Sequence, residues 1–421
     1  MSARTGLGHH KETHHKLLLL GGSRGNVPSI RAAKRAGFYT MVADRNSNAS
    51  GLLVADQEIG IDLIDTDALL IEIEALGGID GVVAMSEVGV RPAVELATRL
   101  GLPSISQEAA ANATSKAAMR RCWSQLGPYS TDFEVVRTEG EARRAVARLG
   151  SFPIIFKPDR GSGSRGVSRV EHPDDITEAF ARCTALPDSD IIVEPCIQGT
   201  ECAAEVLIYN GQTSVLCIGQ NVKSPYPYRV NMSIEYPLPL SVDQQEVIAE
   251  MCHQAISAIG LTQGVAHIEF AYTDEGPVLF ELGARCGGGH IPLIAAHVSA
   301  VDEFIEACRM ACGISPKAFT PTARRGAVYQ FLIFPPGKVA EIEIPEIVRN
   351  HSDILDVAVT IQEGETIPTL RDNWGRVGFA VTLTQTRESA IALANWACEL
   401  ITIRYEDGMV SHPISMSLCE Q

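Results

Sequence analysis

Two glutamates that face each other across a predicted hairpin carry the strongest chemical signal in the sequence. Glu269 and Glu281 lie in apolar runs on either side of Asp274-Glu275-Gly276. A three-residue turn, with glycine where positive φ is needed, pairs the two glutamates on one face of the hairpin. Opposed carboxylates repel each other, so we expect a cation between them. Oxygen ligands beside a phosphate suit Mg²⁺, with Mn²⁺ as a second choice, whereas a longer turn would separate the acids and leave a solvated polar face.

The residues that follow the second glutamate suit a reacting phosphoryl group. Arg285 is a bidentate cation, and Gly287-Gly288-Gly289 leave the backbone unobstructed. Together they can hold a transferring phosphoryl group or an acyl phosphate. Gly288 and His290 are expected to contact substrate, although a hydrogen-bonded structural role is the more common fate of such a histidine.

A lysine on an apolar strand, followed by a glycine-rich loop, is typical of an anion site. Phe152–Pro158 reads FPIIFKP and carries Lys157, and residues 160–166 read RGSGSRG. Glycines in such a loop let backbone N–H groups approach a phosphate, and serines add hydroxyl donors. A flexible surface loop is the alternative for this segment in isolation. The expected phosphate contacts in the loop are Gly161, Ser162, Gly163, Ser164 and Gly166.

A short linker between two acids then predicts an adenine hinge. Residues 191–201 read IIVEPCIQGTE, in which Glu194 ends a strand and Glu201 follows a glycine. We expect backbone groups near Ile197 to read the base and Glu201 to accept hydrogen bonds from ribose. Further along, residues 221–240 contain Lys223 and Arg229, which suit a substrate pocket about as well as an exposed proline-rich connection.

The elements that must position these residues begin with a Rossmann-like unit. Strands are predicted at Leu17–Leu20, Tyr39–Ala43 and Gly81–Met85, with helices at Ile30–Ala36 and Arg91–Leu100. Short apolar strands that alternate with helices indicate a parallel sheet.

The glycine turn after the first strand resembles a dinucleotide-binding turn only in part. Gly21 and Gly22 are adjacent, whereas the G-x-G-x-x-G fingerprint separates its first two glycines. A structural strand-to-helix turn is therefore favoured over a nicotinamide site, despite Asp44 at the end of the next strand.

The whole chain is predicted to be α/β with four segments. Residues 1–15 form a leader or tag-like segment rich in histidine, with a metal-binding tract as the less favoured alternative. Residues 16–110 form the Rossmann-like unit, 111–318 contain the motifs, and 319–421 form a β-rich lobe with a closing helix. Within that lobe, strands are expected at 327–334, 357–361 and 377–383, and the helix at 387–403.

Composition excludes several classes of protein. The 421 residues include 45% hydrophobic residues and carry a net charge of −16, which argues against a nucleic-acid binder. No apolar run reaches the roughly 18 to 20 residues that a bilayer span needs, so no membrane partner is expected. Eleven cysteines without a C-x-x-C pair predict buried thiols and a cytoplasmic location.

Taken together, these motifs resemble the ATP-grasp superfamily over nearly the full chain. The resemblance implies that Lys116, within Thr114-Ser-Lys-Ala-Ala-Met119, and Lys157 contact the phosphates of ATP. Glu194 and Glu201 fall at the hinge. It further assigns Glu269 and Glu281 to magnesium, and Glu281 and Arg285 to catalysis. One position departs from the family, because Gly283 stands where asparagine is usual, so the second metal is expected to be held less completely.

The C-terminal region resembles the bacilysin-type L-amino acid ligases over Ala327–Gly378, including Phe334-Pro-Pro-Gly337. The implied activity is an ATP-dependent carboxylate–amine ligase that forms an acyl phosphate and releases ADP and phosphate. Its implied partners are a small carboxylic acid, most simply an amino acid, and an amine, and dimers are common in the family. The alternatives are a carboxylase that uses bicarbonate and a non-catalytic ATP-binding regulator.

Overall fold

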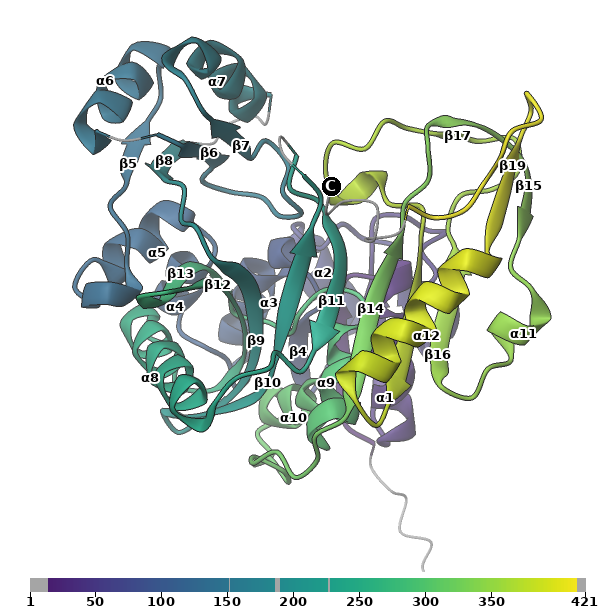
Figure 1. Cartoon of the computed structure of the whole chain (residues 1–421). Coiled ribbons are helices and arrows are strands. Elements are labelled where there is room, and N and C mark those ends of the chain that lie inside the picture. The colour runs from purple at the N-terminus through teal and green to yellow at the C-terminus, as the bar shows by residue number, and fades with distance from the viewer. Residues whose placement is uncertain (1–13, 151, 186–189, 226–227, 415–421) are drawn as a thin grey trace, which may run out of the picture.

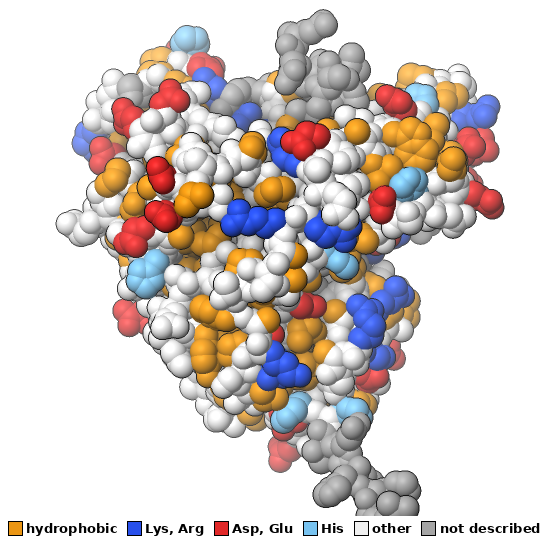
Figure 2. Space-filling view, turned by 60° about the horizontal axis from the view of Figure 1, so that its bottom comes forward, with side chains coloured by type: hydrophobic (Ala, Val, Ile, Leu, Met, Phe, Trp, Pro, Cys, Tyr) orange, Lys and Arg blue, Asp and Glu red, His pale blue; other side chains and the backbone are white. Residues whose placement is uncertain are grey.

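The computed structural model describes residues 14–150, 152–185, 190–225 and 228–414. The predicted leader at 1–15 lies outside the described residues except for its last two positions. Within the described ranges, no helix combines the length and the apolarity needed to cross a membrane. On the face shown in Figure 2, basic and acidic side chains are interspersed and form no continuous basic stripe.

The N-terminal unit is a four-stranded parallel sheet in the order β3-β2-β1-β4. Residues Leu17–Leu20 of the central strand are fully buried, which explains their unbroken apolar run. The prediction missed β3 and α2 and found the rest to within a few residues. The elements are β1 (Lys16–Leu20), α1 (Val27–Arg35), β2 (Tyr39–Ala43), β3 (Gln57–Ile59), α2 (Thr66–Ala75), β4 (Gly81–Ala84) and α3 (Val90–Leu100).

The glycine turn after β1 is held by the protein itself. The backbone N–H of Gly22 donates to Oδ2 of Asp44 at 2.8 Å, and a Cβ on Gly51 would lie 2.7 Å from the Cα of Gly22. Asp44 therefore closes the turn, as expected for a structural turn.

A small four-stranded antiparallel sheet follows, in the order β5-β8-β6-β7. Figure 1 shows it with α6 and α7 as a separate lobe at the upper left. Helix α6 begins with a capping box between Thr138 and Glu141 and ends at Gly150 in the left-handed region. The elements are β5 (Glu134–Val136), α6 (Glu139–Leu149), β6 (Ile154–Pro158), β7 (Ser168–Val170), α7 (Ile176–Thr184) and β8 (Ile191–Pro195).

An eight-stranded sheet forms the centre of the molecule, in the order β13-β12-β9-β10-β11-β14-β18-β16. It crosses the predicted boundary at 318/319, because β11 pairs with β14. The predicted segment boundaries therefore divide the sequence but not this sheet. Its strands are β9 (Thr200–Tyr209), β10 (Gln212–Lys223), β11 (Asn231–Tyr236), β12 (Gly264–Thr273), β13 (Gly276–Gly283), β14 (Gly326–Leu332), β16 (Ile354–Val359) and β18 (Gly378–Thr384).

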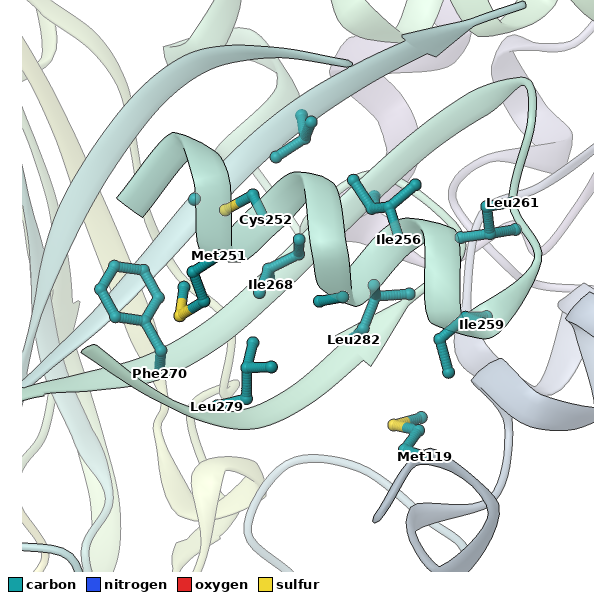
Figure 3. Packing of buried hydrophobic residues seen from close by; sticks show 14 of the residues in the cluster. Met119, Met251, Cys252, Ile256, Ile259, Leu261, Ile268, Phe270, Leu279 and Leu282 are labelled. Carbon is teal, nitrogen blue, oxygen red and sulfur yellow. The ribbon is translucent and has the colours of Figure 1, made fainter. Parts of the chain in front are cut away.

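Helix α8 covers the β12–β13 end of this sheet. Figure 3 shows Met251, Cys252 and Ile256 of α8 packed toward Ile268 and Leu282 on the two strands. This apolar packing holds one face of the β12–β13 hairpin in place, so the other face of the hairpin is free for polar residues. The helices near the sheet are α4 (Gln107–Ala113), α5 (Lys116–Trp123), α8 (Val242–Ile259), α9 (Ile291–Ser299), α10 (Glu303–Ala311) and α12 (Arg387–Leu400).

The C-terminal lobe adds a second small sheet in the order β17-β15-β19-β20. The three strands and the helix predicted in this region correspond to β14, β16, β18 and α12, with end shifts of up to three residues. The prediction missed the small sheet, whose strands are short and partly exposed. Its elements are β15 (Gly337–Glu343), α11 (Glu346–Arg349), β17 (Thr366–Ile367), β19 (Thr402–Tyr405) and β20 (Val410–Ser411).

Candidate active site

A pocket of about 440 Å³ lies where the small lobe, the large sheet and the C-terminal lobe meet. Such a volume is in the usual range for small-molecule sites. The structure brings nearly all predicted site residues to its wall, and only Gly166 and His290 are outside it. On the wall are Lys116, Lys157, Gly161, Ser162, Gly163, Ser164, Glu194, Ile197, Glu201, Lys223, Arg229, Glu269, Glu281, Arg285 and Gly288.

The hairpin acids, Glu269 and Glu281, are directly paired across β12 and β13. The predicted three-residue turn is wrong in detail. Thr273 pairs with Gly276, so the turn has two residues, and a bulge that leaves Phe280 unpaired restores the register before the acids. The pairing was therefore predicted correctly although its cause was not.

The hairpin acids fit a magnesium ion. Their side chains are 36% and 26% exposed, which leaves room for water and phosphate oxygens. Burial would raise the pKa of Glu269, but the hydrogen bond to His267 and nearby cations lower it to about 2, so it is ionised at neutral pH. Across the described residues, no group of three His, Cys, Asp or Glu side chains could hold a metal. Mg²⁺ commonly binds through one or two carboxylates plus substrate phosphates, which matches this donor set.

A buried chain of polar groups supports Glu269 from behind. His267 contacts Oε1 of Glu205 through Nδ1 at 2.5 Å and Oε1 of Glu269 through Nε2 at 3.4 Å. Glu205, on β9, is fully buried and also accepts a hydrogen bond from the backbone N–H of Gly287 at 3.1 Å. The sequence did not lead us to predict a role for His267 or Glu205, although Glu205 is a single acid inside the apolar run of β9 and was therefore an available signal.

The two predicted phosphate lysines have different neighbours. Lys116 Nζ lies 2.9 Å from the carbonyl oxygen of Gly161 and 3.2 Å from Oε1 of Glu281. Lys157 Nζ lies 2.5 Å from Oε1 of Glu194, and the other oxygen of that carboxylate, Oε2, accepts a hydrogen bond from Nε of Arg120 at 2.8 Å. Burial lowers the pKa of Lys157 to about 8, partly offset by the charge of Glu194.

Glu194, which was predicted at the hinge, lies on the pocket wall and pairs with two cations of the protein. Burial would raise its pKa, but Arg120 and Lys157 lower it to about 2, so the carboxylate is ionised between two cations. Its oxygens are occupied by protein partners, and it positions Lys157. Arg120 was missed because nothing in its local sequence distinguishes it from a surface arginine.

Glu201 forms an ion-pair cluster with two of the predicted substrate residues. Lys223 Nζ lies 3.3 Å from one carboxylate oxygen, and Arg229 pairs with the other. The cluster lies beside Ile197 on the wall of the pocket. Lys223 and Arg229 therefore form ion pairs with Glu201, the acid that was expected to bind the ribose.

Arg285 pairs with a residue of the N-terminal unit that the sequence did not reveal. Its Nε lies 3.4 Å from Oε2 of Glu87, next to β4, and its guanidinium donates to the carbonyl oxygen of Cys286 at 2.7 Å. The glycine turn of the same unit also reaches the site, since a Cβ on Gly25 would lie 3.0 Å from the Cα of Gly289.

Two predicted contacts need correction. His290 is 1% exposed, contacts Oδ2 of Asp356 at 2.7 Å and the hydroxyl of Tyr329 at 3.3 Å, and is not on the pocket wall. This corresponds to the structural alternative. Gly166 has φ +73° and packs against Pro158, where a Cβ would lie 2.9 Å from Cγ, so it shapes the loop from behind.

The C-terminal lobe completes the pocket with residues that the sequence did not single out. The backbone N–H of Asn373 donates to the carbonyl oxygen of Gly163 at 3.2 Å, which joins this lobe to the glycine loop. We call this side the C-terminal wall, and it consists of Tyr329, Phe331, Asn373, Trp374 and Arg376.

Known proteins share both the fold and the order of these parts. The ATP-grasp domain model matches residues 150–292, and the model of the L-amino acid ligase C-terminal domain 2 matches residues 330–406. The uncharacterized protein y4rH of Sinorhizobium fredii is 25% identical over 398 residues, which are 91% of this chain and 82% of that protein.

Two named ligases are also similar. The D-alanine–D-alanine ligase of Mycobacterium tuberculosis is 33% identical over 159 residues, which are 34% of this chain and 42% of that protein. The crystal structure of L-amino acid ligase from Bacillus licheniformis superposes with a TM-score of 0.80 and 22% identity, and the match covers 93% of this chain and 99% of that chain. The chain therefore belongs to the ATP-grasp superfamily and is an ATP-dependent carboxylate–amine ligase with an L-amino acid ligase type of C-terminal region.

Proposed function

We propose that this ligase activates the carboxylate of a small acid, most simply an amino acid, as an acyl phosphate and transfers it to an amine. The observation that carries the proposal is the position of Lys116, which contacts both Gly161 of the glycine loop and the hairpin acid Glu281. One cation thus joins the predicted phosphate loop to the predicted metal ligand. The names of the two similar ligases support an amino acid as the acid.

In this proposal the nucleotide spans the wall from the hinge to the hairpin. Ile197 and Glu201 face adenosine, and the glycine loop with Lys116 and Lys157 faces the phosphates. Glu269 and Glu281 would hold Mg²⁺, and water or phosphate oxygens would take the place that Gly283 leaves without a side chain. Bound Mg²⁺ supplies positive charge that offsets the negative charge on the transferring phosphoryl group.

The chain's own residues position the reactants and neutralise charge. A carboxylate oxygen of the acid attacks the terminal phosphorus, and the bond from that phosphorus to ADP breaks. The amine nitrogen then attacks the acyl carbon, phosphate leaves, and the nitrogen loses a proton. Arg285 and the lysines stabilise charge on the phosphoryl group as it moves, while the enclosing loop limits hydrolysis.

No protein nucleophile is required at the reacting end. Cys286 follows Arg285 directly, but burial holds the pKa of its thiol well above the ordinary value. It therefore remains a neutral thiol at physiological pH, and only a thiolate would be a competent nucleophile. Catalysis rests on positioning and electrostatics.

The test is a product assay on the full chain with Mg²⁺, ATP and pairs drawn from the proteinogenic L-amino acids. We expect ADP and phosphate in equal amounts together with a dipeptide, and a hydroxamate when hydroxylamine replaces the amine. AMP and pyrophosphate would contradict the acyl phosphate. Turnover with bicarbonate alone would favour the carboxylase, and ATP binding without turnover on any pair would favour the regulator.

A homodimer is also proposed. Light scattering coupled to size-exclusion chromatography measures the mass of the particle directly. A monomer mass at micromolar concentration would contradict it.

A further inference from the structure

Arg376 differs from the other cations of the pocket wall. Each buried or half-buried lysine or arginine on that wall has a carboxylate oxygen within 4.0 Å, except Arg376, which has none among the described residues. The paired cations are Lys116, Lys157, Lys223, Arg229 and Arg285.

The guanidinium of Arg376 is held in a defined place. It lies over the ring of Phe331, 3.6 Å from the ring centroid, and its Nε donates to the carbonyl oxygen of Asn373 at 2.8 Å. Burial lowers the pKa of Arg376 to about 10, so it is charged at neutral pH. The stacked ring and the Nε bond fix the plane and leave the two terminal nitrogens for a planar anion, which Arg binds in a bidentate manner.

Two asparagines lie between Arg376 and the hairpin acids. Oδ1 of Asn221 on β10 and Oδ1 of Asn231 on β11 are buried and have no hydrogen-bond partner within the described part of the chain. Both residues are on the pocket wall. A buried amide oxygen without a partner is costly, so a ligand that donates hydrogen bonds here would stabilise it.

The strand order sets these groups in a row. From β12, which carries Glu269, the sheet runs through β9, β10 and β11 to β14, which carries Phe331. Four strand spacings of about 4.8 Å correspond to about 19 Å on a flat sheet, and less on a curved one. Arg376 is therefore remote from the hairpin acids, and the asparagines lie between them.

We infer that Arg376, with Asn221 and Asn231, forms the subsite for the substrate that supplies the amine, and that this substrate carries its own free carboxylate. The carboxylate binds Arg376, and the amine donates to the asparagine oxygens on the side of the acyl phosphate. The inference rests on the proposed function, because it names the second substrate of that reaction. The order of groups along the sheet matches the order acyl carbon, amine nitrogen and carboxylate.

The test uses the full-length Arg376→Gln variant and the best amino acid pair from the product assay. With the amino acid as the amine, we expect its KM to rise about 10- to 100-fold, as for the loss of a charge-assisted bidentate contact. With the C-terminal amide of the same amino acid, KM should differ less than about twofold between variant and wild type. KM for ATP and for the acid should stay within about twofold.

Several outcomes would overturn the subsite. An equal loss with the amino acid and its amide would mean that Arg376 does not hold the carboxylate. A rise in the KM of ATP would assign Arg376 to phosphate, and a rise confined to the acid would place the other substrate there. Arg376→Lys keeps the charge over Phe331 but removes the planar fork, so its KM for the amino acid should be intermediate. A KM equal to that of wild type would contradict bidentate binding.

A matched control and a binding measurement separate this inference from the proposed function. Arg404→Gln removes an exposed arginine of the same lobe, paired with Glu341, and should leave every KM unchanged. Calorimetry with Mg²⁺, a non-hydrolysable ATP analogue and the L-amino acid panel measures the subsite without turnover. If wild type makes no product but binds an amino acid that Arg376→Gln does not bind, the proposed function fails and the subsite stands. If wild type binds no amino acid, the subsite is wrong.

Discussion

The two ends of the pocket differ in how their cations are paired. We call the glycine loop, the β12–β13 hairpin and the Glu201 cluster the nucleotide end. Its buried and half-buried lysines and arginines are paired with carboxylates. At the C-terminal wall, Arg376 faces the pocket without such a partner among the described residues. The first arrangement holds charges in place before ATP arrives, because unpaired buried charges are costly. The second leaves binding capacity for a ligand. The contrast suggests that the nucleotide end serves chemistry common to the superfamily, whereas the C-terminal wall selects the substrate.

The largest effect that tests this contrast is expected from Glu281→Gln. Loss of the hairpin charge should lower kcat at least about a thousandfold, or about 4 kcal/mol, because the metal ligand matters most as charge moves in the transition state. ATP affinity should weaken by less than about tenfold. Glu275→Gln changes an exposed acid in the turn of the same hairpin and serves as the control. Turnover within about threefold of wild type would contradict the metal assignment.

A smaller effect is expected from Lys157→Ala, which removes a charge that contacts ATP before the reaction begins. ATP affinity, measured by calorimetry, should fall about 10- to 100-fold, because the lysine charge meets the phosphates before reaction. Stability should fall as well, since Glu194 would be left buried with Arg120 alone. Lys338→Ala removes an exposed ion pair with Glu406 and is the control. An unchanged ATP affinity would count against the nucleotide position.

The pH dependence of ATP binding offers a finer test of the same lysine. The pKa of Lys157 is about 8 in the free protein, and phosphates favour its charged form, so binding above pH 8 takes up a proton. ATP affinity should therefore be level below pH 8 and fall above it, by at most about tenfold per pH unit. Proton uptake, measured by calorimetry in buffers of different ionisation enthalpy, should vanish in Lys157→Ala. A level profile from pH 7 to 9.5 would contradict the role of the charge.

The smallest effect is expected at the rim of the C-terminal wall. Trp374 is 72% exposed, and a Cβ on Gly163 would lie 3.3 Å from its Nε1. Trp374→Ala should leave ATP affinity within about threefold and change the KM of the amine substrate more than that of ATP. Steady-state kinetics with each substrate varied in turn measures both values. A larger change in the KM of ATP than in the KM of the amine would contradict the distinction between the nucleotide end and the C-terminal wall.

Much of the nucleotide end could be predicted because its signals are local. Glu269 and Glu281 flank one short turn, so their pairing follows from alternation along a single hairpin. The route to that pairing could not be predicted, because a two-residue turn with a bulge at Phe280 and a three-residue turn without one lead to the same register. A bulge depends on packing against the neighbouring strand and helix, which the hairpin's own residues do not specify.

By itself, the sequence determined most strands and helices of the N-terminal unit, the glycine loop and the paired acids, since periodicity and turn chemistry act over a few residues. Only the tertiary structure decided which distant residues complete the site. Glu87 meets Arg285, Arg120 meets Glu194, and Asn373 accepts a hydrogen bond from the backbone of Asn231 142 positions away. The C-terminal wall reaches the pocket because β11 pairs with β14, which joins the two lobes in one sheet. Such contacts arise from the burial of apolar faces against one another, and that packing brings Arg376 to the same pocket as the hairpin acids without any local pattern around it.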